Sequence, residues 1–392
     1  MSNHLFSIFM GTKLVFGKDV AKNVGEELVK LGSKKTMIVT DKGIINAGLL
    51  EVILSSITTS ELEYVIYNEV PSNPPAATVE KGVNVFKQHN CDSFVAVGGG
   101  SAMDACKAIS IMSENDGHVI DYDIGGRTFT KQGSPVITIP TTSGTGSEVT
   151  QWAVITDKKR NWKASIGSPL MAPTVSLVDP MLTIGLPPAI TAATGVDALT
   201  HAIEAYTTKA AITGSSPITD ALALEAIRLV GNSLRKAYAQ GDNYKARENT
   251  MLGSTIAGMA FPQIGLGSTH GLAHPLGGYY DVPHGVANAI LLPYIMNFNL
   301  LTCPERFANI ARVLGENIEG LSPMEAAEKS VVAVKKLVKD VNIPTLKSFD
   351  VNPEDFTHLA EDAIQDQTAK DNPRRTTLQD AINLYNQAYN EE

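Results

Sequence analysis

The second half of this chain is built around the segment Gly265-Leu-Gly-Ser-Thr-His270-Gly-Leu-Ala-His274-Pro-Leu-Gly-Gly-Tyr-Tyr-Asp-Val-Pro-His284-Gly285, which holds three of the eight histidines. His270 and His274 are four residues apart, so on a helix they would lie on one face, one turn apart. The Gly-Gly and Asp-Val-Pro segments before His284 favour a break that folds the chain back towards the other two. This spacing is typical of side chains that share a metal ion.

A second pair of polar residues in an apolar context lies upstream, in Gly195-Val-Asp197-Ala-Leu-Thr-His201-Ala-Ile-Glu204. Asp197 and His201 are again four residues apart. One carboxylate oxygen and up to three imidazoles would hold a divalent ion and leave a coordination position open for a substrate, as catalytic sites require. Each histidine taken singly is more simply a hydrogen-bonded core or surface residue. The two pairs, flanked by small apolar residues, favour one shared site.

Length and composition indicate an ordinary globular protein with two domains, because 392 residues exceed a typical single core. The net charge of −9 and the pI near 5.4 argue against nucleic acid or an anionic membrane surface as the main partner. The N-terminus lacks a basic segment followed by an apolar core, and no run of about 18 uncharged apolar residues occurs, so we expect a cytoplasmic protein. Three cysteines without paired spacing are interpreted as buried, reduced thiols: Cys91, Cys106 and Cys303.

The first half alternates short β-branched runs with helical patterns. Strands are predicted at residues 36–40, 64–67, 93–97, 135–139, 154–157 and 174–178. Helices are predicted at residues 20–31, 45–56, 77–89 and 102–113. Such alternation predicts a largely parallel sheet with helices on both faces, whose ligands bind at the carboxyl ends of the strands.

Beyond Gly185-Leu-Pro-Pro188 only helical patterns remain, at residues 190–207, 220–238, 244–259, 304–314 and 323–341. We therefore predict an α/β N-terminal dinucleotide-binding domain, residues 1–186, followed by an all-helical metal-binding domain, residues 187–392. The metal ligands would lie on the inner helices of the second domain.

Three predicted strand ends carry residues suited to a dinucleotide. Val97 leads into Gly98-Gly99-Gly100-Ser101 and then a helix, so free N–H groups would face a pyrophosphate; the alternative is a tight turn. Asp41 would bond a ribose hydroxyl and oppose a 2′-phosphate; the alternative is a helix cap. The acid precedes the glycines, so the usual G-x-G-x-x-G fingerprint does not apply. The loop Pro140-Thr-Thr-Ser-Gly-Thr-Gly-Ser-Glu-Val149 offers donors to a phosphate or an amide, or is a polar turn.

Together, the Asp197 and histidine segments, Gly98-Gly-Gly-Ser101 and Pro140-Thr-Thr-x-Gly-Thr-Gly-Ser-Glu148 resemble the iron-containing (metal-dependent, group III) alcohol dehydrogenases from about Leu14 to about Arg374. The resemblance implies a nucleotide-binding α/β domain and a helical metal domain. It implies the metal ligands Asp197, His201, His270 and His284, with His274 as a non-ligand histidine near the nicotinamide. It implies cofactor contacts at Asp41, Asn73, Gly98, Gly99, Ser101, Thr141, Thr142 and Lys163, with Asp104 as a further addition.

The substrate pocket is where this sequence departs from members of the family. It has Gln151-Trp152 at pocket-facing positions that vary among members, and Phe261 and Leu266 would complete an apolar wall. Near the end, Thr368-Ala-Lys370-Asp-Asn372-Pro-Arg374 carries charges where members have Pro and Gly. The bulky Trp152 predicts a short substrate, and Lys370 or Arg374 would accept an anionic tail such as that of sulfoacetaldehyde.

The resemblance implies reversible, NAD- and metal-dependent interconversion of a small primary alcohol and its aldehyde by direct hydride transfer. The ion, Fe²⁺ first and Zn²⁺ or Mn²⁺ as alternatives, would bind the substrate oxygen, and His274 would relay the hydroxyl proton. We expect a homodimer or a higher homo-oligomer. Three rival hypotheses are a reductase of a small anionic aldehyde, a dehydroquinate-synthase-like lyase, whose metal set includes a glutamate, and a non-catalytic nucleotide or metal sensor.

Overall fold

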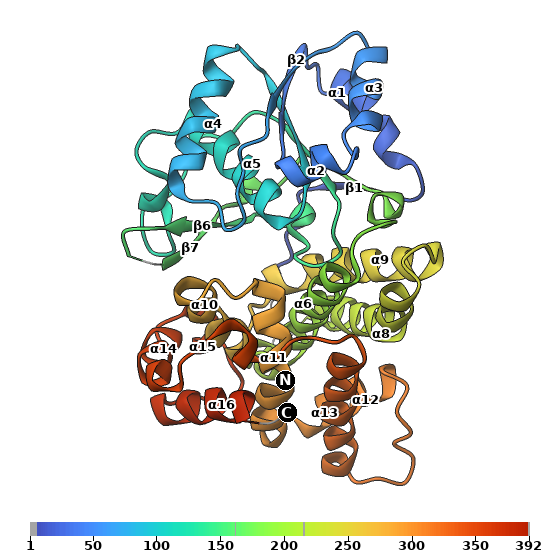
Figure 1. Ribbon diagram of the computed structural model, residues 1–392, viewed down its shortest axis with the longest axis vertical. Helices are drawn as coiled ribbons and strands as arrows, with labels where there is room; N and C mark the ends of the chain where they lie inside the picture. Colours follow the sequence, from blue (N-terminus) through green and yellow to red (C-terminus); the bar gives the residue numbers. More distant parts are fainter. Residues whose placement is uncertain (1–5, 161, 215, 391–392) are drawn as a thin grey trace. The chain divides into compact units, whose positions relative to one another are not determined.

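The computed structural model describes residues 6–160, 162–214 and 216–390, and these form two compact units (Figure 1). The first unit consists of Phe9–Thr142 and Gly146–Ile184. The second consists of Gly185–Glu392 with Ser143–Thr145 and the N-terminal segment up to Ile8. The main division thus lies at Gly185, two residues before the predicted start of the second domain at 187.

Six parallel strands form the main sheet of the first unit, in the order β1-β8-β5-β4-β2-β3. Their bounds are β1 Lys13–Phe16, β2 Lys35–Val39, β3 Glu63–Tyr67, β4 Ser93–Gly98, β5 Val136–Pro140 and β8 Val175–Val178. The central strands β4 and β5 are buried along their whole length, as their continuous apolar runs require in a sheet covered on both faces. The predicted parallel sheet is confirmed, and β1 is an addition to it.

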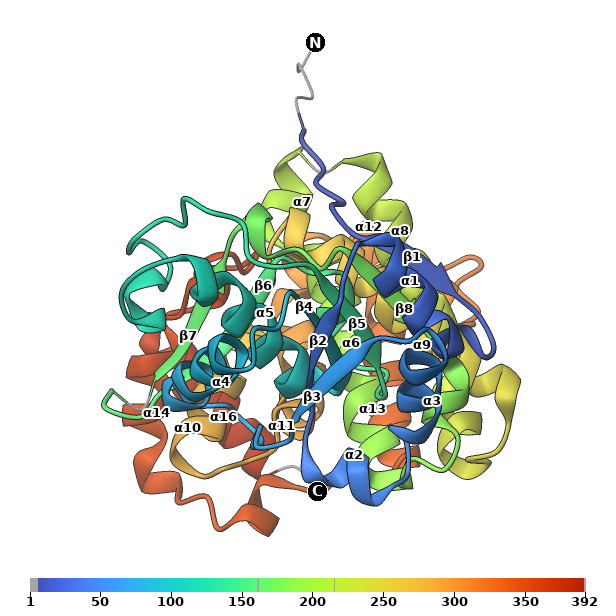
Figure 2. The ribbon, with the colours of Figure 1, turned by 90° about the horizontal axis from the view of Figure 1, so that it is seen from above.

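Helices cover both faces of this sheet: α1 Val24–Lys30 and α3 Glu51–Thr59 on one, α4 Ala76–Gln88 and α5 Gly100–Glu114 on the other (Figure 2). The alternation of side chains along β4 explains the two cores, because Phe94 and Ala96 pack with α4 and α5, whereas Val95 and Val97 pack with α1 and α3. The helix predicted at 45–56 is split into α2 Lys42–Asn46 and α3, because Gly48 has a positive φ of 70°.

A two-stranded antiparallel hairpin, β6 Trp152–Asp157 with β7 Trp162–Gly167, adds to the first unit. Asp123 holds β7, because its carboxylate accepts hydrogen bonds from the Trp162 indole and the Ser165 amide, each at 3.0 Å. The strand β7 lies outside the predictions. Its neighbour β6 begins at Trp152, two residues before the predicted strand.

The described residues of the second unit form only helical elements and connecting segments. The α-helices are α6 Pro188–Thr207, α7 Lys209–Gly214, α8 Pro217–Ala239, α9 Tyr244–Ala260, α10 Ser268–Tyr279, α11 His284–Asn299, α12 Pro304–Val313, α13 Pro323–Asp340, α14 Phe356–Ala363, α15 Gln367–Lys370 and α16 Leu378–Asn390. Helix α6 is buried on most sides and packs against α8, α9 and α11. Polar side chains on its surface therefore lie inside the unit.

Among the described residues, one helical stretch, His284–Thr302, has the length and hydropathy of a membrane span. Of its apolar window, 67% is buried inside the protein. Its residues belong to two hydrophobic cores of the second unit, one around α6 and α8 and the other around α10, α14 and α16. The apolar character of α11 is therefore explained by its position in these cores.

Candidate active site

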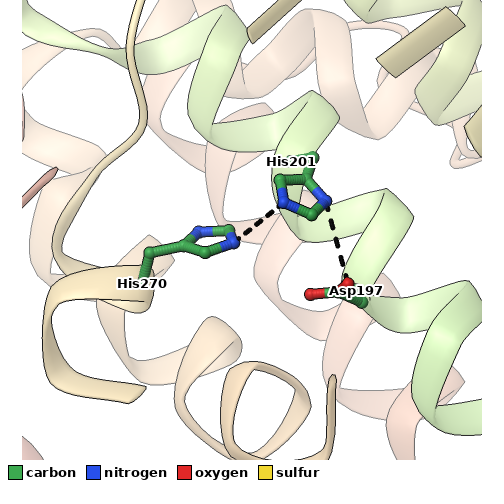
Figure 3. Close-up of side chains that lie close together, drawn as sticks. All are labelled: Asp197, His201 and His270. Carbon is green, nitrogen blue, oxygen red and sulfur yellow. Dashed lines mark hydrogen bonds and ion pairs between the residues drawn. The ribbon is translucent and has the colours of Figure 1, made fainter. Parts of the chain in front are cut away.

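Helix α6 places Asp197 and His201 one turn apart on its buried surface, with His201 Nδ1 4.0 Å from Asp197 Oδ2. His270 lies in the first turn of α10, and its Nε2 is 3.1 Å from His201 Nε2 (Figure 3). His284 begins α11, and its Nε2 is 3.7 Å from Asp197 Oδ1. The turn predicted between His274 and His284 includes Asp281, with a positive φ of 52°. The structure thus brings together all four residues that the sequence indicated as metal ligands.

The chemistry of this cluster suits a cation. Ligand atoms of Asp197, His201 and His270 all lie within 4.8 Å of one another. Burial opposes ionisation of Asp197, but attraction to His201 and the hydrogen bond from Asn288 contribute to holding the pKa of this carboxyl below its usual value. Burial and the adjacent His201 lower the pKa of His270 well below its usual value, so its imidazole is neutral and able to donate a lone pair. Among the described residues, His201 Nδ1 is a buried polar atom without a hydrogen-bond partner.

Glu204 stands behind the cluster and fixes His270. Its Oε2 is 2.6 Å from His270 Nδ1, and its Oε1 accepts a hydrogen bond from the Thr269 amide at 2.7 Å. Burial raises the pKa of Glu204 to about 7. A carboxylate on Nδ1 leaves Nε2 of His270 facing the cluster, the usual arrangement behind a metal-bound histidine. Glu204 is seven residues after Asp197, on the same helical face, and this spacing is the signal that would have assigned it a role.

Asn288 is a second residue that the sequence did not single out. It lies on α11 one turn after His284, and its side-chain amide nitrogen is 2.8 Å from Asp197 Oδ1. The same nitrogen is 3.1 Å from His270 Nε2 and 3.2 Å from His284 Nε2. The i, i+4 spacing from His284 is its only sequence signal.

His274 lies beside the cluster and is held from a different direction. Its ring stacks on that of His284 with centroids 5.5 Å apart, and its Nδ1 is 2.7 Å from Asp366 Oδ2. Thr368 donates its amide and its hydroxyl to Asp366 Oδ1, at 2.8 and 2.7 Å. Burial alone would raise the pKa of Asp366, but His274 and Thr368 lower it to about 2. The hydroxyl of Thr368, predicted as a pocket residue, is thus engaged with Asp366.

The remaining predicted pocket residues of the second unit are placed as follows. The Phe261 ring stacks on His201 with centroids 4.7 Å apart, and Leu266 is partly buried. Lys370 is exposed at the end of α15. Arg374 lies 3.9 Å above the Phe298 ring and donates to the Phe298 carbonyl at 2.9 Å. Arg374 is therefore engaged within the helical unit, which weighs against its predicted role as an anion acceptor.

In the first unit, the carboxyl ends of β2, β4 and β5 bring several predicted cofactor residues to one sheet edge. Asp41 caps α2, since its Oδ1 accepts from the Gly43 and Ile44 amides at 2.7 and 3.1 Å, as the alternative interpretation had it. Its other oxygen points towards Gly98, because a Cβ added at Gly98 would lie 3.5 Å from Oδ2. One residue can therefore both cap the helix and present a carboxylate oxygen to a ligand at this edge.

The same edge contains an open helix end and an unused hydroxyl. Gly99 is the N-cap of α5 and supplies no side chain to cap it, so Gly99, Gly100 and Ser101 leave backbone N–H groups for an anion. Thr141 donates its amide to the Gly98 carbonyl at 3.0 Å, and among the described residues its buried Oγ1 has no partner. Thr142 adjoins Gly99, because a Cβ added there would lie 3.3 Å from its Oγ1. These features suit a dinucleotide phosphate.

Asn73 and Lys163 are linked to each other through the hairpin. Lys163 Nζ donates to Thr156 Oγ1 at 3.4 Å, and this hydroxyl donates to the Asn73 carbonyl at 3.1 Å. Asp104 is placed differently, because its Oδ1 accepts from Ser147 Oγ at 2.5 Å and its Oδ2 from the Val154 amide at 2.9 Å. Both oxygens of Asp104 thus serve the protein itself, which weighs against its predicted role as a cofactor contact.

Lys107, which no sequence motif indicated, anchors the loop that leads to the predicted pocket residues. The residue is 0% exposed, and burial lowers the pKa of its ammonium. Its Nζ donates to the carbonyl oxygens of Ser147, Thr150 and Trp152 and lies 3.3 Å from Asp104. The sequence signal for Lys107 is its spacing from Asp104, because side chains three residues apart on a helix are neighbours.

Gln151 and Trp152 follow directly from this anchored loop. Among the described residues, Gln151 Oε1 is a buried acceptor without a hydrogen-bond partner. The Trp152 ring lies across Gly167 of the facing strand, because a Cβ added there would meet the ring at 2.1 Å. Gln151 therefore has an acceptor available for a ligand, whereas Trp152 has at least part of its ring committed to the hairpin.

Two family models match this sequence. The one described as iron-containing alcohol dehydrogenase matches residues 11–180, and the one described as Fe-containing alcohol dehydrogenase family, C-terminal, matches residues 191–389. The sequence is 43% identical to 1,3-propanediol dehydrogenase of Klebsiella pneumoniae over 392 residues, covering 99% of this chain and 100% of that protein. It is 41% identical to NAD-dependent methanol dehydrogenase of Bacillus methanolicus over 383 residues, covering 97% and 99%. A solved 1,3-propanediol oxidoreductase matches with a TM-score of 0.95 at 43% identity, covering 98% of this chain and 100% of that one.

Proposed function

We propose that this chain, which belongs to the iron-containing alcohol dehydrogenase family, oxidises short primary alcohols and reduces their aldehydes. It would use NAD as the hydride carrier and one divalent ion. That the protein is an alcohol dehydrogenase and aldehyde reductase follows from the family itself. The observation that carries the proposal is the buried cluster of Asp197, His201, His270 and His284 beside His274.

These four side chains would hold the ion, with Fe²⁺ as the first expectation and Zn²⁺ or Mn²⁺ as alternatives. Such an ion supplies Lewis-acid polarisation of a substrate oxygen when it is bound. The Phe261 ring stacks on His201 and so gives the cluster an apolar surface on that side. Glu204 holds His270 in the orientation that points Nε2 inwards.

His274 is proposed to move the proton of the substrate hydroxyl. Asp366 accepts a hydrogen bond from Nδ1, which places the remaining lone pair of the neutral ring on Nε2. Nε2 would accept the proton during alcohol oxidation and return it during aldehyde reduction. Thr368 contributes by holding the Asp366 carboxylate in place.

The preference for NAD rests on the sheet edge of the first unit. The open N-terminus of α5 with Gly98, Gly99 and Ser101 would bind the pyrophosphate, and Thr141 and Thr142 offer hydroxyls beside it. The free oxygen of Asp41 would accept a hydrogen bond from a ribose hydroxyl and oppose a 2′-phosphate. Lys163 and Asn73 are proposed as additional contacts.

A short, uncharged alcohol is the proposed substrate. The relatives with 43% and 41% identity are named for 1,3-propanediol and methanol. The unpaired Gln151 Oε1 suits a substrate with a second hydroxyl. The contact of Arg374 with Phe298 removes one support for an anionic aldehyde such as sulfoacetaldehyde. A dehydroquinate-synthase-like lyase has no support in the metal cluster, whose carboxylate ligand is an aspartate.

Purified protein, loaded separately with Fe²⁺, Zn²⁺ or Mn²⁺ under anaerobic conditions, tests the proposal with C2 to C4 alcohols, diols and aldehydes and with NAD(H) or NADP(H). We expect metal-dependent turnover that favours NAD(H) and short neutral substrates. Full activity of metal-stripped protein, or a preference for sulfoacetaldehyde over propionaldehyde, would contradict it. A cytoplasmic location and a homodimeric or larger assembly belong to the same proposal, and light scattering tests the assembly.

A further inference from the structure

Asn288 lies at the centre of the candidate metal cluster although it is not among the proposed ligands. Its side chain is 0% exposed, and its amide nitrogen is within hydrogen-bond distance of Asp197 Oδ1, His270 Nε2 and His284 Nε2. Among the described residues, its Oδ1 has no partner. An amide nitrogen has two N–H groups, so the three acceptors exceed what Asn288 serves at one time.

The three acceptor atoms differ in the lone pairs that remain free once a cation is bound. A neutral imidazole has one lone pair on the acceptor nitrogen, so Nε2 of His270 or His284 gives that pair either to an N–H group or to an ion. A carboxylate oxygen has two lone-pair sites and accepts a hydrogen bond while it binds an ion. With the ion in place, Asp197 is therefore the one acceptor of the three that Asn288 keeps.

We propose that Asn288 is a positioning residue of the metal centre, whose amide N–H holds Oδ1 of Asp197 and so fixes the orientation in which the carboxylate meets the ion. In the metal-free protein the second N–H of the same nitrogen bonds to one imidazole at a time and keeps the ligand atoms gathered. The inference rests on the proposed function, because it requires that the cluster bind a metal. It adds a residue that orients a ligand without binding the ion itself.

The opposite orientation of the amide is disfavoured by its surroundings. Turning the side chain over would place Oδ1 at the position that lies 2.8 Å from Asp197 Oδ1, and a carboxylate oxygen has no proton to donate. Two acceptor oxygens would then face each other in a buried site, an arrangement that buried polar groups avoid. The hydrogen-bond partners thus identify the nitrogen as the atom that faces the cluster.

Metal affinity of the purified full-length protein tests this role without reference to turnover. We would measure Zn²⁺ and Co²⁺ dissociation constants by competition with a chromophoric chelator, for wild type, Asn288→Leu and Asn288→Ala. Removing a residue that orients a metal ligand typically weakens metal binding by about 10- to 100-fold, and we expect that loss for both ions. The intensity of the visible absorption of bound Co²⁺ reports its coordination number. We expect the variants to show the same intensity as wild type.

Thr200→Val is the matched control, because Thr200 is a buried polar residue of α6 whose hydroxyl donates to the Val196 carbonyl at 2.8 Å. It should bind both ions as wild type does. Affinities of the folded Asn288 variants within about threefold of wild type would overturn the inference, and so would a Co²⁺ spectrum that reports the loss of one ligand. If Asn288→Leu fails to fold, Asn288→Ala decides. Wild-type protein that binds neither ion would instead refute the proposed function.

Discussion

The Nδ1 atom of His274 lies 2.7 Å from Oδ2 of Asp366, on a segment 92 residues further along the chain. His270 has the same arrangement with Glu204, at 2.6 Å. Two histidines on consecutive turns of α10 are therefore each held through Nδ1 by a separate carboxylate. Glu204 points the Nε2 of His270 into the candidate metal cluster, and Asp366 leaves the Nε2 of His274 beside it, where we propose that it transfers the proton.

We predict that Asp366→Asn lowers kcat by about 10- to 100-fold, at or below the low end of what general acid–base groups contribute, because Asp366 acts only by orienting His274. An asparagine can present its N–H₂ group to Nδ1, which would favour the tautomer with the proton on Nε2 and remove the base. Steady-state kinetics and metal analysis of the same preparation test this. An unchanged kcat at full metal content would show that Asp366 does not orient His274. Thr368→Val, which removes one of the bonds to Asp366, should have a smaller effect in the same direction.

We predict that His270→Ala and His284→Ala lose bound metal and turnover but still bind NADH. The reason is that the metal cluster and the proposed dinucleotide residues belong to different compact units. Metal analysis and titration of NADH fluorescence on each purified variant provide the two measurements. Retention of full activity by a variant that has lost its metal would rule out the metal assignment. His358→Ala, at an exposed histidine of α14, is the control and should retain both properties.

We predict that Trp152→Ala raises activity on longer alcohols relative to ethanol, because it removes bulk from the proposed pocket. The ring also packs on Gly167, so some loss of thermal stability should accompany the change. Trp162→Ala removes the other tryptophan of the hairpin and controls for that loss. If both variants keep the wild-type chain-length profile, Trp152 supports the hairpin and does not line the pocket.

We predict that Asp41→Asn shifts the kcat/KM ratio towards NADP(H). Two like charges about 4 Å apart repel by roughly 4 kcal/mol at an effective dielectric near 20, and less where solvent enters. Asparagine is as good a helix cap as aspartate, so this variant removes the charge and retains the capping of α2. Asp41→Gly should shift the ratio further, since it also removes the ribose acceptor and so weakens the use of NAD(H). A wild-type preference for NADP(H), or a ratio that neither substitution moves, would leave Asp41 as a helix cap alone.

The sequence predicted the elements whose pattern is local. The apolar run of β4 and the i, i+4 pairs of Asp197 and His201 follow from periods of a few residues, and the structure places these groups as expected. Short elements such as β1 and β7 carry too few residues for a pattern. Asp366 could not be assigned to His274, because no spacing rule links positions so far apart.

Two other residues of the site lie at helical spacing from a predicted ligand, but their residue types do not by themselves indicate a metal site. Asn288 and Glu204 each lie on the same helical face as a predicted ligand, one and two turns away. A buried amide or carboxylate in an apolar helix is usually paired with some neighbour, and the neighbour is known only from the packing of α6, α10 and α11. Arg374 illustrates the converse, because its charge suggested an anion site whereas its guanidinium lies on Phe298.

Lys107 anchors the 147–152 loop through backbone carbonyls and the Ser147 and Thr150 hydroxyls, and none of these bonds uses the side chain of Gln151 or Trp152. The ammonium binds the carbonyl oxygens of Ser147, Thr150 and Trp152, and every amino acid supplies a carbonyl. Substitutions at positions 151 and 152 therefore leave these anchoring bonds available. If Gln151 and Trp152 line the substrate pocket, as we propose, directed evolution towards new substrates should begin at these two positions while Lys107 is kept.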